Sequence, residues 1–381
     1  MIPRSLGLCL QRSKKSVLLL GPRQTGKSTL IQSLSPDATI TLALESTYLE
    51  FARNPEELTQ RLAAAPARTV FIDEVQRLPT LLNTIQAILD GWPHPPKFYL
   101  TGSSARKLRR GRANLLPGRI HTYHLGPLTC AELAHRMDTR RALATGTLPG
   151  IWTEPDETER IKTLRSYAAT YLKEEVQAEA LTKNLEGFSR FLFVVAAEAG
   201  KFLDLSKLAA EAGVPRQSAM RYFEILEDTL LLTRCEAFRK SPRRRLTQSP
   251  RFFFFDVGVL NGLVGNFVAS PDRIGTLFEH LIFTQLASGA LAKDRDIRIS
   301  SYRTEHGAEV DFIVELEGTV TAVEVKASTT IGSSDLRGFR SFAEYYAKPH
   351  RAVIAYLGNT RKVIHGVDVF PWQVLLKDLG L

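Results

Sequence analysis

The chain has 381 residues, of which 44% are hydrophobic and 24% charged, a composition typical of a globular protein with two or three domains. Fifty Lys and Arg against 40 Asp and Glu give a net charge of +10, which favours polyanionic partners such as nucleic acid or an anionic membrane surface. No segment reaches the ~18 apolar residues of a membrane span, and the three cysteines are too widely spaced for a metal or redox motif, so we expect a soluble protein of a reducing cytoplasm.

The first 150 residues alternate short β-forming runs with helical stretches. The expected strands cover residues 16–20, 38–44, 69–72, 98–101 and 120–125. Apolar strands separated by helices indicate a parallel sheet that is covered on both faces. The sequence therefore predicts an α/β domain over residues 1–150, which ends where Gly and Pro cluster between residues 146 and 156.

A phosphate-binding loop follows the first expected strand. It matches the pattern G-x-x-x-x-G-K-S and stands between that strand and a helix that begins near Lys27. The glycines let backbone N–H groups close around phosphates, Lys27 meets the β and γ oxygens, and the Ser28 hydroxyl is a ligand for Mg²⁺. The predicted ATP-binding residues are Gly21, Pro22, Arg23, Gln24, Thr25, Gly26, Lys27, Ser28, Thr29 and Asp73.

Polar residues at the ends of two further strands complete this site. Asp73 follows strand 69–72 and is expected to hold the metal ion, while Glu74 polarises the attacking water as general base. Strand 98–101 leads into Gly102 and Ser103, which places a hydroxyl beside the γ-phosphate. We therefore expect hydrolysis of Mg-ATP; the alternative for the two acids is a surface Asp-Glu pair.

Six cations and no acid stand between residues 101 and 123. Such a run neutralises phosphate, or stabilises the transition state from a neighbouring subunit. The alternative is a solvated basic face. The six are Arg106, Lys107, Arg109, Arg110, Arg112 and Arg119.

These motifs resemble those of AAA-type ATPases that carry a C-terminal domain long catalogued as of unknown function. The resemblance implies that Ser103 is the sensor residue and Arg119 the finger that acts on a neighbouring subunit, with Pro117 where the family usually has Ala. It also implies a homo-oligomer, with a hexamer as one candidate. It extends over nearly the whole chain and rests on residues 21–28, Ile72-Asp73-Glu74-Val75-Gln76, Leu100-Thr101-Gly102-Ser103-Ser104, Pro117-Gly118-Arg119 and Leu125-Gly126-Pro127-Leu128.

Residues 151–265 are expected to form a helical domain that contains a winged helix. Residues 205–212 and 216–228 are predicted helices joined by a tight turn, and the second resembles a recognition helix. Strands at 230–234 and 252–255 flank a basic loop, which is typical of a wing. We expect contact with DNA phosphates; a winged helix that only joins two domains is the alternative. The predicted DNA contacts are Arg216, Gln217, Arg221, Arg243, Arg244 and Arg245.

Residues 266–381 are expected to form an α/β domain around a hairpin whose turn is 317–318. A two-residue turn pairs residues whose numbers sum to 635, so Asp311 faces Glu324, and Glu309 faces Lys326. Alternation along each strand puts these four polar groups on one face. The residues predicted to pack on the other face are Val310, Phe312, Val314, Val323 and Val325.

The carboxylates of this hairpin need a positive charge. Two acids about 5 Å apart repel each other, and Glu279 is a lone acid on an apolar helix that needs Lys326 or a metal as partner. Glu279, Asp311, Glu324 and Lys326 together resemble the PD-(D/E)XK nuclease core. The resemblance implies that the three acids hold Mg²⁺ or Mn²⁺ and that Lys326 orients or deprotonates the attacking water. The alternative is a structural ion-pair cluster that includes Lys326 and Arg303.

The sequence thus predicts a P-loop AAA-type ATPase domain, a winged-helix domain and a restriction-endonuclease-like domain. The expected function is ATP-dependent action on DNA, with metal-dependent cleavage at the C-terminal end. The rival hypothesis is a nucleotide-switched DNA- or protein-binding module whose nuclease-like domain is inactive.

Overall fold

The computed structural model describes residues 2–103, 116–171, 184–239 and 249–381. The chain divides into two compact units. The first contains residues 1–126 with the short segments 228–231 and 291–294, and the second contains residues 127–227, 232–290 and 295–381.

The first unit is built on a parallel sheet of five strands with the order β2-β3-β4-β1-β5. All five residues of β1 are buried, as expected for a central strand that is covered on both faces. The predicted parallel sheet is therefore confirmed. Its strands are β1 (Ser16–Leu20), β2 (Ala38–Thr41), β3 (Thr69–Asp73), β4 (Lys97–Gly102) and β5 (Ile120–His124).

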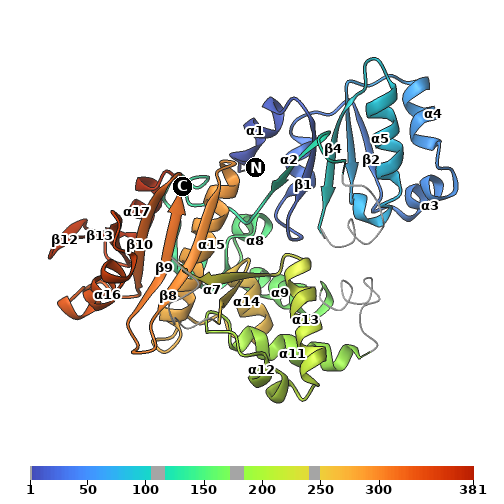
Figure 1. Cartoon of the computed structure of the whole chain (residues 1–381). Coiled ribbons are helices and arrows are strands. Elements are labelled where there is room, and N and C mark those ends of the chain that lie inside the picture. Colours follow the sequence, from blue (N-terminus) through green and yellow to red (C-terminus); the bar gives the residue numbers. More distant parts are fainter. Residues whose placement is uncertain (1, 104–115, 172–183, 240–248) are drawn as a thin grey trace. The chain divides into compact units, whose positions relative to one another are not determined.

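Helices cover both faces of this sheet (Figure 1). Alternate residues of a strand point to opposite faces, so Leu18 packs in one core with α3, α4 and α5, while Val17 packs in another with α1 and α2. The helices of this unit are α1 (Leu6–Arg12), α2 (Lys27–Gln32), α3 (Glu45–Arg53), α4 (Glu57–Ala64), the 3₁₀ turn η1 (Val75–Arg77) and α5 (Leu81–Gly91).

The second unit begins with helices. The predicted pair is confirmed as α12 (Leu205–Ala212) and α13 (Arg216–Asp228), separated by Gly213, whose φ of +62° is left-handed. The side chain of Asp204 accepts hydrogen bonds from the first turn of α12, which fixes where that helix begins. The other helices here are α7 (Thr139–Thr145), α8 (Pro149–Thr153), α9 (Glu157–Ser166), the π-helix η2 (Tyr167–Tyr171), α11 (Leu185–Ala197) and α14 (Val257–Val264).

Residues 127–150 belong to this second unit, although the sequence placed them in the first domain. Buried Asp256 caps α14 and also accepts a hydrogen bond from Thr147 N (2.7 Å). Asn261 donates to the carbonyl oxygens of Leu143 and Ala144, 2.9 Å from each. These contacts attach α7 to α14, which local sequence patterns do not reveal.

The rest of the unit is built on an eight-stranded mixed sheet, with the order β12-β13-β11-β10-β9-β8-β6-β7. The strands that flank the predicted wing, β6 and β7, join this sheet because β6 pairs with β8. The sheet therefore spans both sides of the boundary predicted at residue 265. Its strands are β6 (Leu232–Ala237), β7 (Arg251–Phe254), β8 (Ile297–Arg303), β9 (Glu309–Leu316), β10 (Thr319–Lys326), β11 (Arg351–Tyr356), β12 (Lys362–Ile364) and β13 (Val367–Pro371).

Helices α15 (Ile274–Ala292) and α16 (Arg337–Tyr346) pack on this sheet. Phe283 of α15 contacts Phe312 of β9, whereas Phe342 of α16 lies in one core with Ile313. Neighbouring residues of a strand point to opposite faces, so these two helices cover opposite faces. The 3₁₀ turn η3 (Ser333–Leu336) leads into α16, and α17 (Trp372–Asp378) ends the chain. Within the described ranges, no helix is long and apolar enough to cross a membrane.

Candidate functional site

The loop between β1 and α2 has the backbone that a phosphate-binding loop requires. A Cβ on Gly21 would lie 2.3 Å from the carbonyl oxygen of Leu125, so only glycine fits there. Gly26 has a φ of +87°, a left-handed conformation that glycine adopts without strain. Lys27, the first residue of α2, is buried, and its Nζ donates to the carbonyl oxygens of Gly21 and Pro22, 2.8 Å from each. The ammonium group of Lys27 therefore lies inside the predicted phosphate-binding loop.

Ser28 and Asp73 lie side by side, although 45 positions separate them in sequence. The Ser28 hydroxyl donates to Asp73 Oδ1 (2.8 Å), and Thr101 Oγ1 donates to the same oxygen. A serine hydroxyl and a carboxylate are hard oxygen ligands of the kind that Mg²⁺ binds beside nucleotide phosphates. These residues therefore fit a magnesium ion.

Glu74 and Ser103 are joined through Gln76. The amide Nε2 of Gln76 donates to Glu74 Oε2 and to Ser103 Oγ, 3.0 Å from the latter. A Cβ on Gly102 would lie 2.9 Å from Gln76 Oε1, so glycine makes room for this amide. The sequence indicated Gln76 only as part of a motif, because its bridging role depends on two strand ends meeting. The structure thus brings the predicted base and sensor residue to one place.

Arg119 lies in the first unit, where it forms an ion pair with Asp90 of α5. Arg119 directly precedes β5, and its Nη2 lies 2.8 Å from Asp90 Oδ2. Its predicted action on a neighbouring subunit stays a prediction. The other cations of that basic run, Arg106, Lys107, Arg109, Arg110 and Arg112, lie outside the described residues.

The predicted register of the β9–β10 hairpin is confirmed from Leu316 opposite Thr319 to Phe312 opposite Val323. Beyond this point the Asp311 carboxylate accepts a hydrogen bond from Val325 N (2.8 Å). The β9–β10 register ends there, before the predicted pairs Asp311–Glu324 and Glu309–Lys326, and Glu309 forms an ion pair with Arg303 of β8. The two strands therefore part where the predicted acidic residues lie.

The pairing of β9 with β8 shifts by one residue near Asp311. Ser300 pairs with Ile313, but Tyr302 pairs with Val310, so β9 has one extra residue there. As a result, Val310 and Ile313 lie in the same core, while Phe312 packs against Phe283 of α15. The expectation that Val310 and Phe312 share a face is wrong, because a bulge interrupts the alternation.

Glu279 of α15 has Arg251 of β7 as its partner, not Lys326. Nη2 of Arg251 donates to Glu279 Oε2, and Nη1 lies 3.7 Å from Asp311 Oδ1. Lys326 Nζ instead lies 2.7 Å from Glu324 Oε1. The sequence analysis overlooked Arg251; the available signal was a lone charge directly before the apolar run 252–255.

Burial and neighbouring charges shift the titration of this cluster. Burial raises the pKa of Asp311 well above its ordinary value, and the nearby carboxylates of Glu279 and Glu324 raise it further. Burial also raises the pKa of Glu324, although Lys326 opposes that rise. For Lys326, burial acts to lower the pKa, but Glu324 reverses the effect and the pKa is raised. Lys326 is therefore an ammonium group that cannot readily accept a proton near neutral pH.

With Arg251 in place, the predicted nuclease ligands Glu279, Asp311 and Glu324 do not fit a metal ion. Across the described parts of the chain, no three His, Cys, Asp or Glu residues lie where they could hold one. Glu279 and Asp311 instead share the guanidinium of Arg251. The acids of the predicted nuclease core are thus arranged as an ion-pair cluster.

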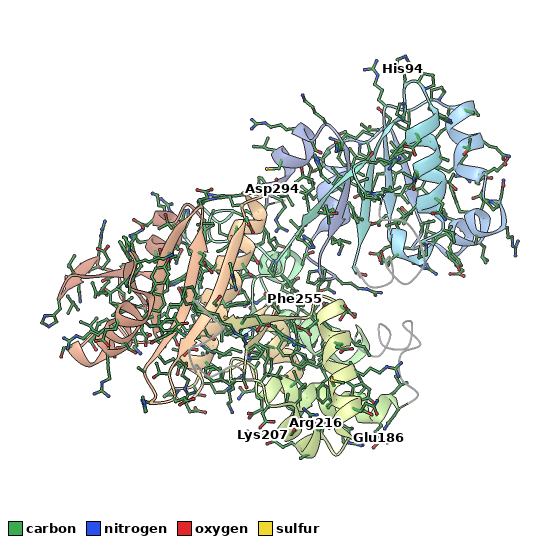
Figure 2. The ribbon with its side chains drawn as sticks, viewed as in Figure 1. His94, Glu186, Lys207, Arg216, Phe255 and Asp294 are labelled. Carbon is green, nitrogen blue, oxygen red and sulfur yellow. The ribbon has the colours of Figure 1, made fainter. Side chains whose placement is uncertain are left out.

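The outward residues of the helix-turn-helix lie as predicted. Arg216, Gln217 and Arg221 of α13 are exposed, and Arg216 Nε donates to Ser206 Oγ of α12 (3.2 Å). Figure 2 shows Arg216 and Lys207 at the outer edge of this helical part. The predicted wing residues Arg243, Arg244 and Arg245 lie outside the described residues.

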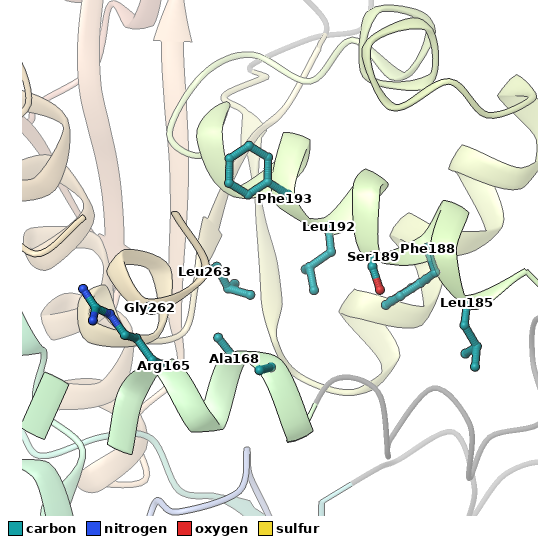
Figure 3. Close-up of a pocket in the computed structure, with 10 residues that line it drawn as sticks. Arg165, Ala168, Leu185, Phe188, Ser189, Leu192, Phe193, Gly262 and Leu263 are labelled. Carbon is teal, nitrogen blue, oxygen red and sulfur yellow. The ribbon is translucent and has the colours of Figure 1, made fainter. Parts of the chain in front are cut away.

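A cavity of about 310 Å³ lies among α9, η2, α11 and α14 (Figure 3). Its lining is mostly apolar and includes Phe188, Leu192 and Leu263, with Arg165 at its edge. None of the predicted site residues lines it.

Three families match successive parts of the chain. Residues 13–134 match an AAA domain, residues 136–270 match a domain of unknown function (DUF8612), and residues 274–375 match a second domain of unknown function (DUF4143). The first unit therefore contains an AAA-type ATPase domain, which supports ATP as the nucleotide.

Whole-chain similarity adds relatives without an assigned role. Uncharacterized proteins of Mycobacterium bovis and Mycobacterium tuberculosis are each 28% identical over 355 residues, which cover 91% of this chain and 77% of theirs. A solved structure of Pif1 helicases on forked double-stranded DNA is 14% identical, with a TM-score of 0.25, and the match covers 47% of this chain and 56% of that one. Protein VC1899 from Vibrio cholerae is 11% identical, with a TM-score of 0.21 and 96% of each chain covered.

Proposed function

We propose that this chain binds and hydrolyses Mg-ATP at the loop between β1 and α2. The observation that carries the proposal is the contact of Ser28 Oγ with Asp73 Oδ1 at 2.8 Å, directly beside the buried Lys27. These residues come from two separate motifs, and hydrolysis of ATP needs both of them in one place. Magnesium, when bound, would neutralise developing charge on the phosphates, and Ser28 and Asp73 would hold it.

The chain's own residues divide the remaining work. Lys27 binds phosphate oxygens through its ammonium group, and backbone N–H groups at the start of α2 add a favourable dipole. Glu74 accepts a proton from the attacking water, and Gln76 holds the Glu74 carboxylate beside Ser103. Ser103, as the sensor residue, places its hydroxyl beside the γ-phosphate. Arg119 completes the site from a neighbouring subunit of a homo-oligomer, after it leaves Asp90.

We propose DNA as the partner of the second unit. The exposed Arg216, Gln217 and Arg221 stand on the second helix of a helix-turn-helix, where recognition helices carry their contacts. The net charge of +10 and the arginines at 243–245 favour the phosphate backbone over base edges. A winged helix that only joins parts of the chain remains the alternative.

For residues 266–381 we propose a domain that binds DNA or a protein partner but does not cut DNA, in preference to the predicted nuclease. Two features support this choice. Lys326 has a raised pKa and pairs with Glu324, so it is a poor base for activating water. Arg251 already forms ion pairs with Glu279 and Asp311, so these carboxylates are not free to bind a catalytic metal ion together.

The nucleotide site is tested by two substitutions. Lys27→Ala should abolish ATP binding, because it removes the ammonium that meets the phosphates. Glu74→Gln should retain binding and lower kcat by about 100-fold or more, because only proton transfer is lost. Phosphate release and equilibrium nucleotide binding measure the two effects. Turnover at the wild-type rate in Glu74→Gln would remove the assignment of the base.

The DNA proposal is tested by replacing Arg243, Arg244 and Arg245 together with Gln. Affinity should fall for all duplex sequences alike, and the slope of log K against log salt should become shallower by up to about 3, since each phosphate contact releases counterions. Titrations at several salt concentrations measure both. Replacing Arg140, Arg295 and Arg298, which lie outside the helix-turn-helix, is the matched control. Unchanged affinity and slope would favour the joining role.

Absence of cleavage is tested with supercoiled plasmid and with single-stranded and branched DNA. The wild-type protein should leave all three intact in Mg²⁺ or Mn²⁺, with or without ATP, because Lys326 stays protonated and Arg251 occupies the acids. Cutting by the wild type that Asp311→Ala abolishes would restore the nuclease function that the sequence predicts. Cutting that persists in Asp311→Ala would indicate a contaminating nuclease. The comparison of the wild type with Asp311→Ala would then be repeated with protein free of that nuclease.

A further inference from the structure

We infer that Arg251 is a permanent internal counter-ion that takes the place of a divalent cation between Glu279 and Asp311. Its removal should turn this acidic cluster into a site that depends on added divalent cations. The inference concerns the second unit alone, so it does not rest on ATP hydrolysis.

The position of Arg251 is fixed on several sides. Its side chain is 6% exposed, and its Nε donates to the carbonyl oxygen of Gly200 (2.6 Å) while Nη2 donates to Glu279. The guanidinium lies 5.2 Å from the ring centroid of Phe253 and 5.7 Å from that of Phe312. Cations are attracted to aromatic faces at such distances. Arg251 is therefore packed into the unit and is not a mobile surface cation.

The backbone beside Arg251 also restricts its movement. Gly200 N donates to the carbonyl oxygen of Phe252 (2.8 Å), and Leu203 N donates to that of Pro250 (2.7 Å). Phe202 forms a β-bridge with Arg251. These backbone contacts join the segment after α11 to β7 and hold the backbone of Arg251 in place.

Arg251 and Lys326 supply two positive charges beside the three carboxyl groups of the cluster. Arg251 pairs with Glu279, and Lys326 pairs with Glu324, which leaves Asp311 as the third carboxyl group. A divalent ion between the same carboxylates would lie close to the guanidinium, and like charges repel strongly where solvent is excluded. Arg251 and a bound metal ion are therefore alternatives.

The test uses the full chain without nucleotide, with Mn²⁺ as the probe. Arg251→Met removes the charge and keeps much of the length, and Arg251→Lys keeps the charge. Arg234→Met is the matched control, because Arg234 of the neighbouring strand β6 also lies over a phenylalanine and pairs with a glutamate. Mn²⁺ binding is followed by electron paramagnetic resonance, and stability by the midpoint of thermal unfolding.

In the wild type and in Arg234→Met, we expect no Mn²⁺ to bind at Asp311. Adding Asp311→Asn to either protein should therefore leave its Mn²⁺ binding unchanged. Arg251→Met should unfold roughly 10 °C lower, because buried carboxylates lose their partner. Millimolar Mn²⁺ should recover much of that loss, and a second change, Asp311→Asn, should remove the Mn²⁺ effect. Arg251→Lys should fall between the wild type and Arg251→Met in stability.

Two results would overturn the inference. One is Mn²⁺ binding by the wild type that disappears in Asp311→Asn, because a metal would then share the cluster with Arg251. The other is an Arg251→Met protein that is as stable as the wild type, or destabilised without any response to Mn²⁺. If Arg251→Met does not fold, the wild-type titration and the Arg251→Lys protein, which should then bind no Mn²⁺, decide the matter.

Discussion

The strand order of the first sheet is the constraint on which the nucleotide site depends. Strands β3, β4 and β1 are adjacent and parallel, so their carboxyl ends meet at the same edge. Each end contributes one part: the phosphate loop follows β1, Asp73 ends β3 and Glu74 follows it, and Ser103 follows β4. Residues that are far apart in sequence therefore come within hydrogen-bond distance, and Gln76 joins two of them. Another strand order would separate the same motifs.

A second constraint acts in the other unit, where buried carboxylates need a positive charge nearby. Proteins meet this need with a metal ion or with a cationic side chain. A metal ion can also activate water, whereas a cationic side chain such as arginine only neutralises the charge. Here Arg251 reaches Glu279 and Asp311 from β7. The acids of the predicted nuclease core therefore form a structural ion-pair cluster, which is the alternative that the sequence analysis left open.

Local rules predicted much of this structure. The bounds of α12 and α13, the parallel sheet and the register around the 317–318 turn follow from caps, glycine positions and alternation. Three features did not follow: the attachment of α7 to α14, the bulge near Asp311, and the position of Arg251. The attachment of α7 and the position of Arg251 depend on contacts between residues 28 or more positions apart, and the bulge depends on how β9 pairs with β8. A local sequence pattern contains none of these contacts. The roles of the six predicted DNA contacts stay predictions.

The chain contains an AAA-type ATPase domain, the helix pair α12 and α13, and a sheet whose acids are held by Arg251. We propose that ATP hydrolysis serves action on DNA. The most direct measurement is the steady-state rate of ATP hydrolysis by the wild-type chain with and without duplex DNA. We predict hydrolysis that requires Mg²⁺ and that DNA stimulates by several-fold. An absence of ATP hydrolysis under both conditions would contradict the account, and a rate that DNA leaves unchanged would contradict its link between the nucleotide site and DNA.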